Sequence, residues 1–264
     1  MQPIPRTEGG VTCDVVGGVA QVLLRHPGKF NAMSRAMWRQ LRLVFQQLQQ
    51  ADGVRCVVLR GADGHFCAGG DIAEYAAFRF DPAGLRDFHE NDVWGGLQAM
   101  LDCDLPIVAQ IEGHCMGAGV EIASCCDLRL ATDTADFGAP IAKLGFPMAP
   151  REAQLVLRAL GERTVREMLL TAAVLPADEL LRRGFLNAVH APEQMEAETK
   201  KRVDRMLRLG PQAARLNKQT LRALAPSAPA GALALLLTQA YAYAPSAEHR
   251  EGIAAFVEKR PPNF

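Results

Sequence analysis

Two glycine-rich stretches decide how this chain folds: Phe66-Cys67-Ala68-Gly69-Gly70-Asp71-Ile72 and Gly113-His114-Cys115-Met116-Gly117-Ala118-Gly119-Val120-Glu121. Each follows an apolar run typical of a strand, and each opens a segment with helical character. At such a turn, backbone N–H groups are left without intrahelical partners and can point toward one place. The two turns therefore predict an oxyanion hole, in which two main-chain donors stabilise negative charge on a carbonyl oxygen.

A second interpretation of both stretches is purely structural. Glycine-rich turns between strands and helices are common in α/β proteins, where they allow the chain to turn tightly. Neither stretch matches the G-x-G-x-x-G dinucleotide fingerprint or the phosphate loop that ends in Gly-Lys-Ser/Thr. The turns alone leave the choice between tight turning and oxyanion stabilisation open.

Composition indicates a globular protein of ordinary type. The 264 residues are 49% hydrophobic, which is enough for a large core, and 29 Lys and Arg balance 29 Asp and Glu. Because a neutral chain has no basic field, we expect neither nucleic acid nor a membrane as a partner. Residues 231–244 are too few to span a bilayer, and the N-terminal segment lacks the apolar run of a signal sequence. We expect a cytoplasmic protein.

The cysteines predict no disulfide framework and no metal site. There are seven, an odd number, and none form a C-x-x-C pair. We expect reduced, mostly buried thiols. Cys67 and Cys115 flank the two turns, where a catalytic nucleophile is the alternative, but the spacing places no base beside either thiol.

Strands and helices alternate along the first part of the chain. Ser34 is expected to cap a helix with apolar residues at helical spacing, and residues 72–100 are expected to be helical with breaks at Pro82 and Gly95-Gly96. Further strands are predicted at 18–24, 54–60, 106–111, 127–131 and 184–189, and further helices at 117–125, 153–160, 164–171 and 176–183.

Beyond Pro192 the strand signals vanish and helices follow one another, separated by Gly210-Pro211, Pro226 to Pro229, and Pro245. The sequence therefore predicts an α/β body over residues 1–195 and a helical region over residues 196–264. Apolar residues of the helical region need a partner surface, either on the body or on another subunit. These are Leu233, Leu236, Leu237, Tyr241, Ile253, Phe256 and Val257.

Taken in order, four motifs resemble the crotonase, or enoyl-CoA hydratase/isomerase, superfamily. They are Arg25-His26-Pro27-Gly28-Lys29-Phe30-Asn31-Ala32, the two glycine-rich stretches with Cys126-Asp127, and Glu251-Gly252-Ile253-Ala254-Ala255-Phe256-Val257-Glu258-Lys259-Arg260. The resemblance covers nearly the whole chain. It implies an α/β spiral of ββα units with a C-terminal helical trimerisation region, assembled as a homo-trimer or hexamer. It also implies acyl-CoA thioester substrates that react through an enolate, with coenzyme A as part of the substrate and no permanently bound cofactor.

The resemblance further implies three catalytic positions. The backbone N–H groups of Ala68 and Ala118 correspond to the oxyanion donors, and Glu121 corresponds to an acid–base glutamate. Glu121 lies about one helical turn after Gly117, so its side chain is expected near the donor end of the helix. The structural alternative is a glutamate that only complements the helix dipole.

Lys29 and Lys259 match positions that meet the phosphates of coenzyme A, and Lys259 and Phe256 are expected to reach the ligand of a neighbouring subunit. The alternative is that both lysines are simply solvated. The remaining positions of the expected coenzyme A site, all within the matching motifs, are Phe30, Ala32, Phe66, Ala68, Asp71, Ile72, Met116 and Gly117. Asp71 has a second interpretation as a helix cap.

One family feature is missing. The second catalytic glutamate normally follows the proline of a Phe-Gly-x-Pro segment, but here Phe137-Gly138-Ala139-Pro140 is followed by Ile141. Syn hydration usually divides two proton transfers between two carboxylates. The implied reaction is hydration or double-bond isomerisation through Glu121. The alternatives are decarboxylation, thioester hydrolysis, or a catalytically silent acyl-CoA-binding subunit. Candidate replacement groups near the turns are Asp71, Glu112, His114 and His65.

Overall fold

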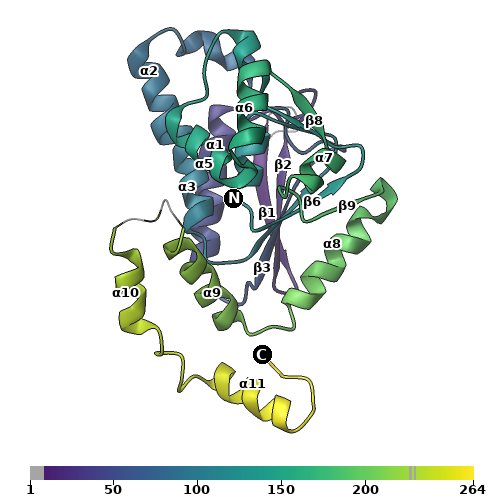
Figure 1. Cartoon of the computed structure of the whole chain (residues 1–264), viewed down its shortest axis with the longest axis vertical. Coiled ribbons are helices and arrows are strands. Elements are labelled where there is room, and N and C mark those ends of the chain that lie inside the picture. Colours follow the sequence, from purple (N-terminus) through teal and green to yellow (C-terminus); the bar gives the residue numbers. More distant parts are fainter. Residues whose placement is uncertain (1–8, 226–227, 229) are drawn as a thin grey trace.

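The computed structural model describes residues 9–225, 228 and 230–264, so the predicted breaks at Pro226 and Pro229 lie outside the described residues. A six-stranded sheet runs through the body (Figure 1). Its strands, in spatial order, are β1 (Gly10–Val16), β2 (Val19–Arg25), β3 (Cys56–Gly61), β4 (Ile107–Ile111), β6 (Leu128–Thr132) and β9 (Ala188–His190). β1 and β2 are antiparallel, and all the later neighbours are parallel.

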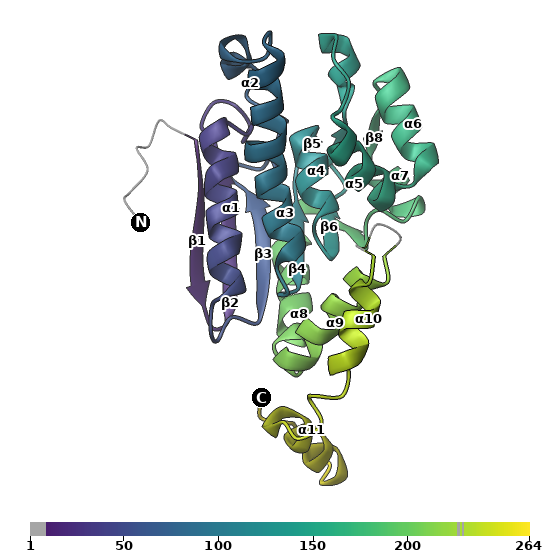
Figure 2. The same ribbon diagram turned by 90° about the vertical axis from the view of Figure 1, so that its left-hand side faces the viewer.

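Both faces of this sheet are covered, as is usual for parallel strands. Because side chains alternate along a strand, Val57 and Leu59 join the main core under helices α1 (Arg35–Gln49), α3 (Trp94–Asp102) and α4 (Ala118–Ser124). The intervening Cys56 and Val58 face α8 (Pro192–Met206), which covers the other side through Val203. Figure 2 shows the helices stacked along the sheet.

A second set of strands places the two glycine-rich turns side by side. β5 (His114–Met116), β7 (Asp136–Gly138) and β8 (Val174–Pro176) form a small sheet. A parallel bridge joins Cys67 to Cys115, with N–H to O distances of 2.8 Å from Met116 to Cys67 and 2.9 Å from Cys67 to His114. Main-chain hydrogen bonds therefore fix the first turn against the second.

The remaining helices surround this layer and continue to the C-terminus. Around the turns lie the 3₁₀ helix η1 (Ile72–Ala77), α2 (Pro82–Asp87), the π-helical turn η2 (Phe88–Val93) and the 3₁₀ helix η3 (Pro140–Leu144). α5 (Pro150–Leu160), α6 (Glu162–Thr171) and α7 (Ala177–Arg182) follow, and the chain ends in α9 (Pro211–Ala223), α10 (Ala232–Gln239) and α11 (Ala247–Val257). No helix in the described ranges is both long and apolar enough to cross a membrane.

Three sequence expectations need correction. β1 was not predicted, because its last three residues are exposed and its side chains show no regular apolar alternation. Gly95-Gly96 does not break the helix but lies inside α3, where a Cβ on Gly96 would come within 3.0 Å of the Trp38 ring. The strand expected at 184–189 begins only at Ala188, because Gly184 turns the chain out of α7 with φ +82°.

The predicted division of the chain between residues 195 and 196 falls inside α8. Met195 packs with Val108 and Leu130 of the sheet, and Val203 packs with Val58 further along the same helix. α8 as a whole therefore belongs to the body.

Candidate active site

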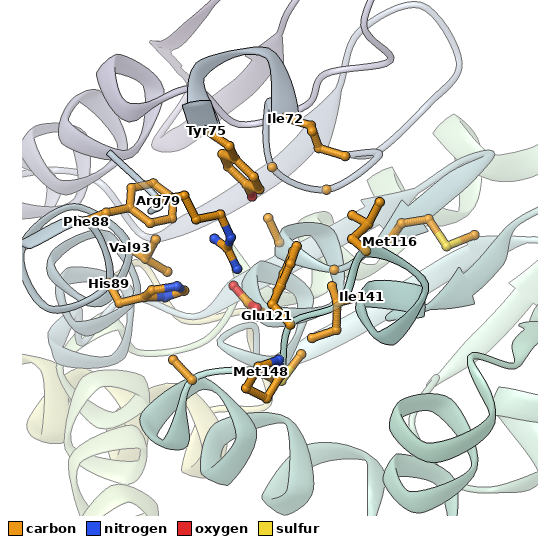
Figure 3. A pocket seen from close by; sticks show the side chains of 18 of the residues that line it. Ile72, Tyr75, Arg79, Phe88, His89, Val93, Met116, Glu121, Ile141 and Met148 are labelled. Carbon is orange, nitrogen blue, oxygen red and sulfur yellow. The ribbon is translucent and has the colours of Figure 1, made fainter. Parts of the chain in front are cut away.

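A cavity of about 300 Å³ opens where the two glycine-rich turns meet η1, η2 and η3 (Figure 3). One side is mainly backbone, formed by the turns and the start of α4. The other side is formed by side chains, most of them apolar or aromatic. The lining residues are Trp38, Ala68–Gly70, Ile72, Tyr75, Arg79, Phe88, His89, Val93, Met116–Ala118, Glu121, Pro140, Ile141, Lys143, Leu144 and 146–149.

Glycine is required at this junction for close approach. Gly117 has φ +47° and Gly69 has φ +113°, which are conformations that residues with a Cβ adopt only with strain. A Cβ on Gly119 would lie 2.6 Å from the carbonyl oxygen of Cys67. The small residues thus hold the second turn against the first, and they also leave backbone amides accessible from the cavity.

The hydrogen bonds correct one of the two predicted oxyanion donors. The N–H of Ala68 donates to the carbonyl oxygen of Phe30 at 2.9 Å, so it is not free. Two residues further on, the N–H of Gly70 has no acceptor among the described residues. Ala118 is the first residue of α4, so its N–H has no acceptor within the helix. Gly70 and Ala118 both line the cavity and are the pair of free donors.

Glu121 faces the cavity from the first turn of α4 (Figure 3). Its carboxyl group has no hydrogen-bond or ion-pair partner in the described part of the chain. Burial raises the pKa of Glu121 to about 8, and the nearby carboxylate of Glu152 adds to the shift. A carboxyl group with a pKa near the pH of the cell can both donate and accept a proton, as acid–base catalysis requires.

The structure adds a second proton-transfer pair that the sequence interpretation missed. His89, in η2, lines the cavity, and its Nδ1 lies 3.0 Å from Oε1 of Glu152, in α5. Glu152 is only 2% exposed, so its carboxylate is shielded from water, and its side-chain partner among the described residues is His89. The two residues are 63 positions apart. No sequence spacing could join them, and no motif in the sequence singled out His89.

Ile141, at the position of the missing glutamate, lines the same cavity from η3. Its side chain is apolar, whereas members of the crotonase superfamily normally have the second catalytic glutamate at this position. The candidate replacement groups named from the sequence lie elsewhere. Glu112 accepts from Gln110 at 2.9 Å, and His114 pairs with Asp136 at 2.8 Å in a separate depression that His65 also lines.

The predicted ligand-binding residues divide into two groups. Ala68, Ile72, Met116 and Gly117 line the cavity together with Ala118 and Glu121. The side chains of Ala32, Phe66 and Asp71 are buried and lie outside the lining of this cavity, so their ligand contacts stay predictions. Phe30 is exposed but packs beside His65 and His114, away from the cavity lining.

Asp71 has two structural partners. Its carboxylate caps η1 by accepting from the N–H of Ala73, and it pairs with Nζ of Lys29 at 2.6 Å. The Lys29 side chain remains 42% exposed, so the ammonium can still meet a phosphate from solvent. The cap interpretation of Asp71 is confirmed, and the role of Lys29 stays a prediction.

Phe256 is in the last turn of α11 and Lys259 follows that helix, and neither residue lines the cavity of its own chain. Phe256 is 84% exposed. The predicted contact of these two residues with a neighbouring subunit's ligand stays a prediction.

The cysteines carry no chemistry here. All seven are free, and all but Cys13 are buried. Burial raises the pKa of Cys67 to about 12 and that of Cys115 well above its usual value, so both thiols stay protonated. The burial of both thiols argues against the nucleophile alternative. The described residues contain no cluster of His, Cys, Asp and Glu that could hold a metal ion.

Comparison with known proteins places this geometry in a family. A sequence model of the enoyl-CoA hydratase/isomerase family matches residues 14–264. A probable enoyl-CoA hydratase of Mycobacterium bovis is 30% identical over 93% of this chain and 94% of its own length. A crotonyl-CoA hydratase of Syntrophomonas wolfei is also 30% identical, over 93% of this chain and 94% of its own length.

Solved structures agree. An enoyl-CoA hydratase/carnithine racemase from Magnetospirillum magneticum superposes with a TM-score of 0.90 at 31% identity, covering 96% of this chain and 94% of its own. AtuE of Pseudomonas aeruginosa superposes with a TM-score of 0.88 at 34% identity, covering 96% and 98%. The predicted crotonase-like α/β fold is confirmed.

Proposed function

The chain belongs to the enoyl-CoA hydratase/isomerase family, and we propose that it hydrates the conjugated double bond of an enoyl-CoA thioester. One observation carries the choice of hydration: two separate proton-transfer groups, Glu121 and the His89–Glu152 pair, face one cavity beside two free backbone amides. Hydration needs a base for water and an acid for the α-carbon. The cavity offers both although Ile141 replaces the second glutamate.

In this mechanism the thioester oxygen accepts hydrogen bonds from the N–H groups of Gly70 and Ala118. His89, with Nδ1 protonated toward Glu152, uses Nε2 to take a proton from water, and the water oxygen bonds to the β-carbon. The π electrons move onto the thioester oxygen, where the two amides stabilise the enolate. The enolate then collapses and the α-carbon takes the proton of Glu121. Proton exchange between the imidazolium and the Glu121 carboxylate restores both groups.

The protonation states fit these roles. With a pKa of about 8, Glu121 is mostly protonated at pH 7 and can act as the acid. The carboxylate of Glu152 stabilises the imidazolium that forms on His89, as a carboxylate partner does in other histidine bases. Removing one oxyanion donor costs about 10²–10³ in rate in enzymes where it has been measured. The amides of Gly70 and Ala118 are therefore expected to be essential.

Two other functions are compatible with residues of this cavity. Glu121 alone could carry one proton between carbons, which is isomerisation. Ile141 favours a silent acyl-CoA-binding subunit, in which the ligand binds without reaction. The unpartnered, cavity-facing Glu121 argues against silence, because a buried carboxyl group without a partner destabilises the fold and is expected to be kept for chemistry.

The test is a product analysis with purified protein. Crotonyl-CoA and a 3-enoyl-CoA are incubated separately, the absorbance of the conjugated thioester is followed, and the product mass is measured. We expect crotonyl-CoA to lose absorbance and gain the mass of one water. Migration of the double bond at unchanged mass would favour the isomerase. Binding without conversion of any enoyl-CoA would favour the silent subunit.

We also propose that the assembly is a trimer or a dimer of trimers, and that Lys29 and a neighbour's Lys259 bind the phosphates of coenzyme A. Two features support this. The described part of α11 exposes apolar side chains, and Lys259 lies outside the cavity of its own chain. A polyanionic ligand on a neutral protein needs local cations of this kind.

A further inference from the structure

Arg79 brings a positive charge to the side-chain wall of the cavity. It follows η1 and lines the cavity beside Tyr75 and Phe88. The centre of its guanidinium lies 3.5 Å from the ring centroid of Phe146 and 4.6 Å from that of Tyr75. Figure 3 shows the guanidinium of Arg79 directed into the cavity. Both rings lie within cation–π distance of the group, and its N–H groups stay available for another partner.

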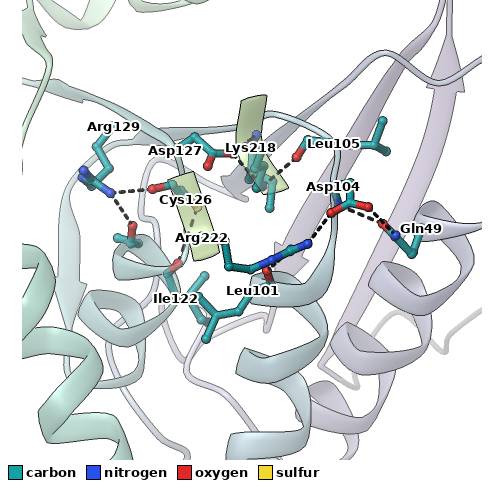
Figure 4. Close-up of polar contacts among 12 residues, drawn as sticks. Gln49, Leu101, Asp104, Leu105, Ile122, Cys126, Asp127, Arg129, Lys218 and Arg222 are labelled. Carbon is teal, nitrogen blue, oxygen red and sulfur yellow. Dashed lines mark hydrogen bonds and ion pairs between the residues drawn. The ribbon is translucent and has the colours of Figure 1, made fainter. Parts of the chain in front are cut away.

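The guanidinium of Arg79 has no hydrogen-bond or ion-pair partner among the residues that the structure describes. Two other partly buried arginines, Arg222 and Arg129, are hydrogen-bonded (Figure 4). Arg222 donates to Asp104 at 2.5 Å and to the carbonyl of Leu101 at 2.8 Å, and Arg129 donates to the carbonyl of Cys126 at 2.5 Å. A guanidinium carries five donors and stays charged, so leaving it unpaired in an apolar cavity is costly.

Resting on the proposed function, we propose that the acyl group of the substrate carries its own carboxylate, and that Arg79 binds it. The substrate class is then an enoyl-CoA thioester of a dicarboxylic acid. A carboxylate matches the two parallel N–H groups of a guanidinium, and such a pair is among the stronger hydrogen-bonded contacts in proteins. The aromatic rings on its faces hold the guanidinium for this recognition.

Neighbouring charges permit an anion here. Glu121 lies in the same cavity, and burial keeps it mostly neutral at pH 7, so it does not repel a second carboxylate. Lys143 is a further cation in the lining. The competing explanation is that Arg79 acts through Glu121 by tuning its acidity. That role would affect every substrate alike, whereas recognition of a carboxylate affects only substrates that carry one.

The test measures binding with saturated thioesters, which cannot react. Glutaryl-CoA and adipyl-CoA are each compared with their terminal methyl esters by calorimetry. We expect at least one acid to bind wild type about 10-fold or more tighter than its ester, as a charged hydrogen bond predicts. Arg79→Met should abolish that preference and leave ester affinity unchanged, and Arg79→Lys should keep part of it. Arg151→Met is the matched control, because Arg151 lies over Trp94 outside this cavity and should change nothing.

Equal binding of acid and ester by wild type would overturn the inference, and so would an equal loss of both in Arg79→Met. A shift in the pH profile of crotonyl-CoA hydration in Arg79→Met, with the acid preference intact, would assign Arg79 to Glu121 instead. Failure of all four thioesters to bind would overturn the proposed function itself. Binding of the esters with normal hydration but no acid preference would overturn only the role of Arg79.

Discussion

Large apolar side chains are buried in the body of this chain but exposed in its C-terminal helices. In the body, Trp38 is 1% exposed and Phe137 is fully buried, and one continuous core lies between the sheet and its helices. In α10 and α11 and the turn between them, Leu235 is 68% exposed, Tyr241 is 79% exposed and Phe256 is 84% exposed. Burial of apolar area drives folding, so the body carries its own stability while the last two helices need a surface to cover them.

α9 marks the change between the two regions. It is fixed to the body by polar contacts, with Nζ of Lys218 at 2.7 Å from both Asp127 and the carbonyl of Leu105 (Figure 4). α10 and α11 extend beyond it (Figure 1). The cavity is lined by residues of the body, and we propose that the exposed apolar faces of the last helices serve assembly. Each prediction below tests this division.

The largest effect is expected from Glu121→Gln, inside the body. The amide keeps the shape of the side chain but cannot exchange a proton, so kcat should fall by about 10²–10⁴, the usual contribution of acid–base catalysis. Thioester affinity and oligomeric state should not change. Steady-state kinetics on crotonyl-CoA with light scattering check this. Wild-type kcat in a pure, folded variant would show that Glu121 only complements the helix dipole.

His89→Asn should reduce hydration next most strongly, by about 10²-fold, because it removes the nitrogen that faces the cavity while keeping an amide near Glu152. Glu152→Gln should give a smaller loss, since His89 keeps a hydrogen-bond partner without the charge that stabilises its imidazolium. The readout is kcat and its pH dependence. Unchanged kcat in His89→Asn would leave Glu121 as the one proton carrier and favour isomerisation.

Deleting residues 245–264 tests the other region. We expect the intact chain to be a trimer or hexamer, and the shortened chain to give monomers or aggregates, because the exposed apolar faces of α11 are proposed to lie between subunits. Lys259→Ala in the intact chain is the milder variant. It should raise KM several-fold with kcat kept. A monodisperse monomer for the intact chain at micromolar concentration would contradict the whole proposal for this region.

Ile141→Glu should raise hydration severalfold by placing a second carboxylate in the cavity, opposite the backbone donors. The gain is limited, because a charge buried among apolar side chains raises its own pKa. The gain is measured as kcat/KM for crotonyl-CoA in wild type and in Ile141→Glu. Thermal melts of both proteins are the folding control. If the folded variant is slower and wild type is already fast, the His89–Glu152 pair fully replaces the missing glutamate.

The smallest effect is thermal. The pKa of Glu121 is about 8 in the fold against an ordinary value of 4.5, so between these pH values the unfolded chain ionises and the folded chain does not. Wild-type stability therefore falls as pH rises from 4.5 to 8. Glu121→Gln cannot ionise, and its Tm relative to wild type should rise across this window by a few degrees. A Tm difference that is flat with pH would show that Glu121 is not buried as described.

The family, the two turns and the position of Glu121 could be predicted from the sequence alone. These features depend on short-range signals: an apolar run before a glycine turn, a helix after it, and a glutamate one helical turn further on. A turn that needs a positive φ favours glycine in any protein, as at Gly117, so such a turn can be recognised from the local sequence. The α/β alternation and the helical C-terminal region are equally local, so they could be predicted.

Tertiary structure decided which groups meet. The choice of Gly70 over Ala68 depends on a hydrogen bond to Phe30 from an earlier turn of the chain. The pairing of His89 with Glu152 and the contact of Arg79 with Phe146 join segments that are distant in sequence and irregular in structure. A single sequence records which residues are present. Their free amides, raised pKa values and unpaired charges arise only when folding removes water and sets distances between them.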